Sequence, residues 1–166
     1  YVRMGHELCQ QQILGSPGNF TASKLKWVQA NEPEIFQKAV YMMLPGDFIA
    51  ARLSGKAQIS TSGLSEAALW NFSKGALATD VLQAMELPED MIPEIVPNFG
   101  YQATVHPDVA AMLGLNSDVK ITYRAGDQPN NALSLNVLKP GEIATTAGTS
   151  AVIYAVSDQD SYDKQN

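Results

Sequence analysis

The sequence predicts an α/β fold, and three features support this prediction. The first part of the chain holds several short segments with the spacing of amphipathic helices. Residues 119–125 (VKITYRA) alternate and are rich in β-favouring side chains, and a helix is expected directly after them from Asp127. Further on, two β-like segments are joined at residues 147–149, which is the pattern of a hairpin. Helices followed by a strand, a helix and a hairpin are typical of α/β architecture.

Several helices are expected in the N-terminal part of the chain. Thr21 or Ser23 is a suitable N-cap for one helix, and Pro33 suits the first position of the next. Asp47 is expected to cap a further helix, which Gly55 ends. The expected helices cover residues 5–13, 21–30, 33–40, 47–54 and 77–87, with turns or loops at residues 60–65 and 88–97.

Strands and helices mix in the C-terminal part. Gly114 is expected to close a helix, and Pro140-Gly141 to form a turn. This turn is the predicted domain boundary: residues 1–138 would close one domain, and residues 139–166 would begin another. The expected strands cover residues 102–105, 119–125, 142–146 and 150–156, and the expected helices cover residues 107–113 and 127–138.

The composition argues against several classes of function. The chain has 166 residues, of which 45% are hydrophobic and only 17% are charged, and its net charge is −6. Its basic residues are scattered, so a nucleic-acid partner is not expected, because a phosphate backbone attracts clustered Lys and Arg. His6 and His106 have no partners at ligand spacing, so no metal site built from side chains is expected.

Other features of the sequence bear on location. Cys9 is the only cysteine, which excludes an intrachain disulfide and favours a reducing compartment. No apolar run approaches the ~18 residues of a membrane span, so no membrane is expected as a partner. The opening stretch YVRMG resembles neither a signal peptide nor a natural start, and we expect it to be a cut end. The predicted location is the cytoplasm.

The first stretch with chemical potential is residues 124–131 (RAGDQPNN), where a strand is expected to end and a helix to begin. Open α/β sheets bind ligands at the carboxyl ends of their strands, so Asp127 is well placed to act as a general base. A helix N-terminus also favours the ionised form of a carboxyl group. The alternative is an ordinary N-cap, because aspartate is a preferred capping residue. Spacing alone favours the cap.

The second stretch is residues 145–150 (TTAGTS), at the tip of the expected hairpin. Small residues such as Gly148 let backbone N–H groups approach a phosphate closely, and the hydroxyls of Thr149 and Ser150 can add hydrogen bonds. The stretch lacks the Gly-Lys-Ser/Thr ending of a P-loop. The alternative is a plain hairpin turn, which spacing alone favours.

Three aromatic residues invite a further interpretation. Trp27, Trp70 and Phe72 could form a surface on which a sugar stacks. Large aromatic side chains in helices are more often buried, so we interpret all three as core residues.

Taken together, these stretches resemble the FGGY family of carbohydrate kinases. The triplet GDQ at residues 126–128, followed by GTS in a hairpin at residues 148–150, is similar to the family pattern. Residues 21–28 (TASKLKWV) and 44–55 (LPGDFIAARLSG) resemble two of its upstream signatures. The resemblance runs in order from about residue 15 to residue 157. Within the family, the chain is most similar to bacterial xylulokinases, although many of these carry Asn where Gln128 stands.

The resemblance implies a fold, a reaction and a set of cofactors. The fold would be part of a ribonuclease-H-like, actin-type two-domain sugar kinase, and the cofactors would be ATP and Mg²⁺. The reaction would be ATP-dependent phosphorylation of a ketose hydroxyl, with D-xylulose converted to D-xylulose 5-phosphate. Asp127 would accept the proton of the sugar hydroxyl, and Gln128 would bind the sugar. Gly148, Thr149 and Ser150 would hold the ATP phosphates.

Two alternatives stay open, and one further expectation follows. The substrate could be another polyol, such as glycerol, ribulose or gluconate, because Gln128 departs from the xylulokinase pattern. A non-catalytic ribonuclease-H-like module is also compatible with the residues. The resemblance implies that the first phosphate strand and the adenosine site lie outside these residues, so the isolated chain is expected to be inactive. Whole family members often dimerise, which implies a homodimer.

Overall fold

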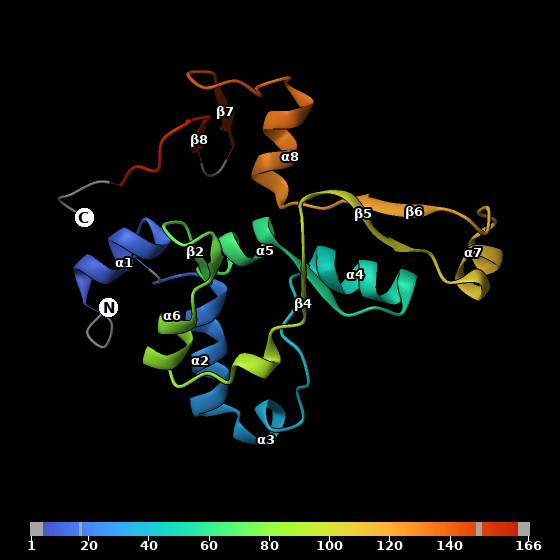
Figure 1. Ribbon diagram of the computed structural model, residues 1–166, viewed down its shortest axis with the longest axis horizontal. Coiled ribbons are helices and arrows are strands. Elements are labelled where there is room, and N and C mark those ends of the chain that lie inside the picture. The colour runs from blue at the N-terminus through green and yellow to red at the C-terminus, as the bar shows by residue number, and fades with distance from the viewer. Residues whose placement is uncertain (1–4, 17, 149–150, 163–166) are drawn as a thin grey trace.

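The computed structural model describes residues 5–16, 18–148 and 151–162, and it has a mixed α/β architecture (Figure 1). The predicted fold class is therefore confirmed. Helices form most of the N-terminal part, and strands become frequent after it. The helices are α1 (His6–Ile13), α2 (Thr21–Asn31), α3 (Pro33–Phe36), α4 (Pro45–Ser54), α5 (Thr61–Glu66), α6 (Thr79–Ala84), α7 (Pro107–Leu113) and α8 (Asp127–Ser134), with a 3₁₀ turn at Glu89–Met91.

The described strands pair two by two. β1 (Gln58–Ser60) runs parallel to β4 (Glu94–Val96), with Ile59 opposite Ile95. The other three pairs are antiparallel: β2 (Trp70–Asn71) with β3 (Ala76–Leu77), β5 (Phe99–Thr104) with β6 (Lys120–Tyr123), and β7 (Ile143–Ala147) with β8 (Ala151–Ala155). In Figure 1, β5 and β6 lie side by side and extend toward α7.

The hydrophobic core lies between the N-terminal helices and the segment from β1 to α6. Ile59, Leu64 and Leu69 have no exposed surface, and Val81 of α6 is equally buried. Burying a side chain of this size stabilises the fold by about 1.5–3 kcal/mol. Cys9 of α1 packs into the same cluster, so α1 is anchored to the core by its own apolar face.

Residues 60–65 form ordered structure, which corrects the expectation of a turn. Ser60 ends β1 and also caps α5, because its Oγ accepts the backbone N–H of Gly63 at 3.0 Å. The serine- and glycine-rich composition that predicts a turn also suits a short capped helix. Tertiary burial of Leu64 decides between the two outcomes. β4 lies in the stretch 88–97 and is a second element that the proline content conceals.

Two of the expected caps are wrong, and the third helix is shorter than expected. Phe20 holds the N-cap position of α2, so Thr21 is its first helical residue. Asp47 is the third residue of α4, where its carboxylate accepts the Leu44 N–H at 3.4 Å. Helix α3 stops at Phe36, and Val40 beyond it is exposed, whereas the pattern predicts an inward-facing side chain.

The predicted C-terminal signals of two helices are confirmed. Gly55 follows α4 with φ 75°, and Gly114 follows α7 with φ 67°. This left-handed backbone favours glycine. The helix expected over residues 127–138 ends earlier, at Ser134, because Asn136 adopts a left-handed backbone with φ 58°.

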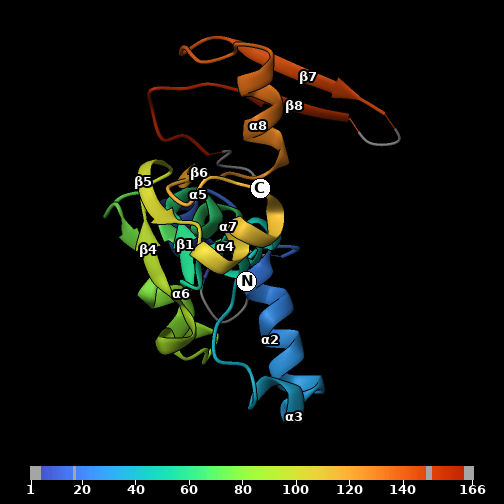
Figure 2. The same ribbon diagram turned by 90° about the vertical axis from the view of Figure 1, so that its right-hand side faces the viewer.

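Helix α8 and the β7–β8 hairpin lie together on one side of the molecule. Figures 1 and 2 both place them above α5. The short stretch between β6 and α8 lies against the end of α5, where Gly126 meets Glu66, although the two are far apart in sequence. Within the residues described, no helix combines the length and the apolar character needed to cross a bilayer.

Candidate active-site cleft

Asp127 lies just after the end of strand β6, at the start of helix α8. β6 ends at Tyr123, and Gly126 holds the N-cap position of α8, so Asp127 is the first helical residue and not the cap. Its Oδ1 accepts the backbone N–H of Gln128 at 2.9 Å, and its Oδ2 accepts the Gln128 side-chain amide at 3.3 Å. Each carboxylate oxygen has a further lone pair, so these bonds leave room to accept a proton.

A cleft of about 610 Å³ opens in front of Asp127. Its lining comes from several elements: α5 contributes Glu66, the start of α8 contributes Asp127 and Gln128, and β8 contributes Tyr154. Polar side chains of Ser62, Ser65 and Asn98 line it as well. A concave site with a few converging polar groups is the usual form of a small-molecule site.

Asn98 orders the side of the cleft that faces Asp127. Its Oδ1 accepts the backbone N–H of Ser62 at 2.7 Å and the hydroxyl of Thr61 at 2.9 Å. One side chain thus satisfies two donors in the first turn of α5, where backbone N–H groups have no partner within the helix. Asn98 thereby fixes the helix whose later turn carries Glu66.

The Glu66 carboxylate lies directly against Gly126. It accepts the Gly126 N–H, and a Cβ built at Gly126 would overlap Glu66 Oε1. Burial raises the pKa of Glu66, and the negative charges of Asp127 and Asp47 raise it further, while the Gly126 N–H opposes them. Two carboxyl groups, those of Glu66 and Asp127, therefore face the same cleft. The surroundings of Glu66 disfavour its charged form.

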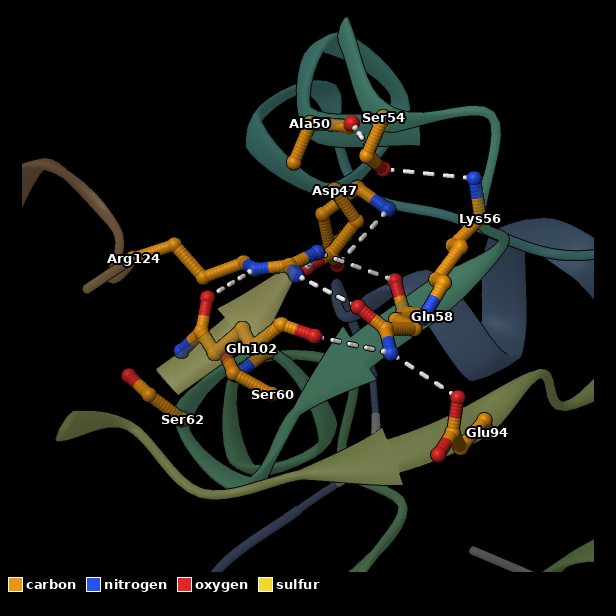
Figure 3. A network of polar contacts seen from close by, with 12 residues as sticks. Asp47, Ala50, Ser54, Lys56, Gln58, Ser60, Ser62, Glu94, Gln102 and Arg124 are labelled. Atoms are coloured by element: carbon orange, nitrogen blue, oxygen red, sulfur yellow. Dashed lines mark hydrogen bonds and ion pairs between the residues drawn. The ribbon is translucent and has the colours of Figure 1, made fainter. Parts of the chain in front are cut away.

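A buried polar network holds the end of β6 from behind (Figure 3). Arg124 is only 8% exposed, and its Nε donates to Gln102 Oε1 at 2.9 Å. Its Nη1 donates to Asp47 Oδ1 at 3.3 Å and to the Gln58 carbonyl at 3.2 Å, and its Nη2 donates to Gln58 Oε1 at 3.2 Å. These bonds join β6 to α4, β1 and β5, three residues before Asp127.

The partners of Arg124 are themselves satisfied. Gln58 donates to Glu94 Oε2 at 2.8 Å, and Gln102 donates to the Pro97 carbonyl at 2.7 Å. Burial raises the pKa of Asp47, whereas the Arg124 guanidinium and backbone N–H groups hold it down. A buried charge pair is tolerated when its remaining donors and acceptors are paired, as they are here.

The structure brings some of the predicted site residues together and leaves others apart. Asp127 and Gln128 are adjacent in the cleft. Gly148 is exposed beyond the end of β7 and is not among the described residues that line the cleft. Thr149 and Ser150 lie outside the described residues. The hairpin nevertheless reaches the cleft through Tyr154.

The aromatic residues differ from the core interpretation. Trp27 is 58% exposed, so its assignment to the core is wrong. Trp70 is half-buried, packs against the core and also lines the cleft, and Phe72 lines the cleft beside it. For Trp70 the two interpretations are compatible, because one ring face can pack while the edge stays accessible.

Three residues that line the cleft or hold its elements in place are not predicted from the sequence: Glu66, Asn98 and Arg124. Glu66 directly follows the stretch 60–65 that predicts a turn, and Asn98 sits in a proline-punctuated loop. Arg124 carries no usable signal, because it follows a strand of mixed polarity (KITY) that already holds the exposed Lys120. Its partners come from distant segments, so the sequence does not reveal them.

The described residues do not supply a metal cage. Among them, no group of three or more His, Cys, Asp or Glu side chains is placed to hold a metal ion. Mg²⁺ in kinase sites is often bound by one or two carboxylates and the substrate phosphates. The lack of a three-residue cage therefore does not argue against Mg²⁺ bound together with ATP, and no step is assigned to the ion.

The chain has the fold of part of a ribonuclease-H-like, actin-type sugar kinase, and an acidic residue after one of its strands lines a polar cleft. Residues 4–134 match the N-terminal domain of the FGGY family of carbohydrate kinases. The chain belongs to this family.

Individual relatives agree with this assignment. The chain is 32% identical to a xylulose kinase of Escherichia coli (strain K12) over 86% of its own length and 29% of the relative's. It is 27% identical to a gluconokinase of Bacillus licheniformis over 86% of its length and 28% of that protein. The crystal structure of xylulose kinase from Rhodospirillum rubrum superposes with a TM-score of 0.90 at 20% identity, covering 98% of this chain and 34% of the other. The chain thus spans less than a third of the length of these curated relatives.

Proposed function

We propose that this chain forms part of an ATP-dependent kinase that phosphorylates a hydroxyl of D-xylulose to give D-xylulose 5-phosphate. The observation that carries the proposal is the Asp127 carboxylate at the head of α8, where it lines a polar cleft with Gln128. The similarity to xylulose kinases supports the choice of sugar. The similarity to a gluconokinase makes a sugar acid the principal alternative substrate.

In this proposal Asp127 accepts the proton of the attacking sugar hydroxyl. The hydroxyl oxygen forms a bond to the γ-phosphorus of ATP, the bond from that phosphorus to the β-γ bridging oxygen breaks, and ADP leaves. A positioned base of this kind contributes about 10²–10⁴-fold to the rate. The two bonds from Gln128 orient the carboxylate, and the Gln128 amide also offers an oxygen to a sugar hydroxyl.

The β7–β8 hairpin is the proposed phosphate holder. Gly148 is exposed at the end of β7, and a residue without a side chain leaves backbone N–H groups open to an anion. Thr149 and Ser150 would add donors. ATP supplies the phosphoryl group when bound, and this chain would position that group opposite Asp127. The domain boundary near Lys139, the cytoplasmic location and the homodimer stay predictions.

The test is ADP release by the full-length protein with D-xylulose, L-ribulose, glycerol and gluconate. We expect turnover with D-xylulose and a fall of about 10²–10⁴-fold in kcat for Asp127→Asn. Asp108→Asn is the matched control, because Asp108 is also an exposed aspartate in the first turn of a helix. Turnover with another sugar of the panel would keep the kinase reaction and assign that sugar as the substrate in place of D-xylulose. Absence of turnover, or an unaffected Asp127→Asn, would favour a helix-start role for Asp127 and a non-catalytic module.

A further inference from the structure

The charged side chains that line the cleft are acidic. Glu66 from α5 and Asp127 from α8 both line it. Among the described residues that line this cleft, none is Lys, Arg or His. The two carboxyl groups therefore face a bound ligand without a counter-charge in the lining.

A buried cation beside the cleft, Arg124, is not available to a ligand. Arg124 lines a neighbouring cavity of about 370 Å³, which also holds Glu66 and Asp127. Its side chain is only 7% exposed, and all three of its nitrogens donate to Asp47, Gln58 or Gln102. Asp47 neutralises its charge at 3.3 Å. Arg124 thus balances Asp47, and the charges of Glu66 and Asp127 stay unbalanced.

The position of Glu66 is held by specific contacts. Its carboxylate accepts the Gly126 N–H, and the absence of a side chain at Gly126 leaves the space that the carboxylate occupies. Burial and the neighbouring Asp127 raise the pKa of Glu66, so the charged form is disfavoured where it stands. A group kept in an unfavourable electrostatic setting at a cleft is a candidate for a functional role.

We propose that Glu66 is a specificity-determining residue that makes this cleft select neutral polyhydroxy sugars and reject sugar acids. The inference rests on the proposed function and narrows its substrate class. A sugar acid brings a carboxylate next to two others, and like charges brought together in a site cost several kcal/mol. A neutral polyol instead donates its hydroxyl hydrogens to the same carboxylate oxygens. The alternative role for Glu66 is to anchor the Gly126 loop alone.

A matched ligand pair separates these roles. Xylitol and D-xylonate share a five-carbon polyhydroxy chain and differ in the carboxylate at one end. Calorimetry on the full-length protein, without nucleotide, measures both dissociation constants. We expect the wild type to bind xylitol at least about tenfold more tightly than D-xylonate. Glu66→Gln should narrow this ratio by about three- to tenfold through tighter D-xylonate binding.

Glu89→Gln is the control variant, because Glu89 is exposed in the 3₁₀ turn and lies outside the cleft lining. It should leave the ratio unchanged. A wild type that binds D-xylonate as tightly as xylitol, or binds neither, overturns the proposal. A Glu66→Gln variant that folds with an unchanged ratio overturns it in favour of loop anchoring. ADP release with D-xylulose, measured in parallel, reports on the kinase proposal separately from charge selection.

Discussion

At the scale of single residues, the cleft is organised by two carboxyl groups in different settings. Asp127 is exposed and bonded to Gln128, whereas Glu66 is half-buried and pressed against Gly126. Burial and the neighbouring Asp127 raise the pKa of Glu66. Asp127 is suited to accept a proton, and Glu66 to shape the electrostatic field that a ligand meets.

The raised pKa of Glu66 predicts a dependence of stability on pH. A carboxyl whose pKa is raised by folding holds its proton more tightly in the folded state. Its unfavourable contribution is therefore absent below its ordinary pKa of 4.5 and grows as pH rises through the folded value. Glu66→Gln should raise the free energy of unfolding at neutral pH, and with it Tm, by on the order of 1 kcal/mol or less because the group is partly solvated.

Thermal unfolding of the full-length protein at pH 4 and pH 7.5 measures this effect. The gain from Glu66→Gln should vanish at the lower pH. The Glu89→Gln control should show little change at either pH, since Glu89 is exposed. A loss of stability at neutral pH would show that the Glu66 carboxylate is a net stabilising group.

Gly126 and Glu66 should be energetically coupled. The backbone of Gly126 has φ −72° and ψ −177°, which alanine adopts freely, so only the contact with Glu66 opposes a methyl group. Gly126→Ala should displace the Glu66 carboxylate and reduce kcat/KM by about tenfold, whereas it should have little effect in a Glu66→Ala background. A coupling energy of about 1 kcal/mol or more is expected.

A double-mutant cycle on ADP release measures that coupling. Gly15→Ala is the control, because a Cβ at Gly15 meets no atom within 4 Å and the residue lies in a loop away from the cleft. Additive effects of Gly126→Ala and Glu66→Ala would contradict the contact between them.

At the scale of elements, Arg124 connects the strand that ends before Asp127 to the rest of the fold. Its bonds reach α4 through Asp47, β1 through Gln58 and β5 through Gln102. Removing one partner of a buried charge pair leaves the other charge uncompensated, which costs about 3–5 kcal/mol. Arg124→Met should therefore lower the free energy of unfolding by that amount.

Urea unfolding of the full-length protein tests this prediction. Arg124→Lys should lose less, because it keeps the charge, but it cannot reproduce the forked set of bonds. Arg52→Met is the control in α4, where the exposed side chain should matter by less than about 0.5 kcal/mol. A loss below about 1 kcal/mol for Arg124→Met would show that water can replace the network.

Elements differ in how well local signals predict them. Gly55 and Gly114 end helices through their own backbone preference, so the sequence predicts both ends correctly. β1 and β4 are three residues each and are stabilised by pairing with each other across a parallel register. Short parallel strands depend on a distant partner, and their own residues carry little information about it.

At the scale of the whole molecule, the chain carries one side of a proposed active site. It spans less than a third of the length of its curated relatives. The family resemblance predicts that the first phosphate strand and the adenosine site lie in other residues of the full-length protein. Phosphoryl transfer depends on positioning both substrates, so one side of a cleft is not expected to suffice.

The 166-residue chain by itself should therefore show no ATP-dependent turnover of D-xylulose. ADP release by the isolated chain, compared with the full-length protein at equal concentration, measures this. Turnover by the chain alone that disappears in Asp127→Asn would contradict the prediction and would show that the described residues hold a complete site.

The sequence by itself determined the fold class, the family and the placement of Asp127 and Gln128 at the start of a helix after a strand. Left-handed glycines and β alternation act over a few residues, so a linear reading captures them, whereas the expected N-caps of α2 and α4 are wrong. Only the tertiary structure decided which side chains Asp127 faces. Arg124 and Asp47 are 77 positions apart, and Glu66 meets Gly126 from another helix. Burial and charge pairing between distant segments are properties of the packed chain, and no local pattern encodes them.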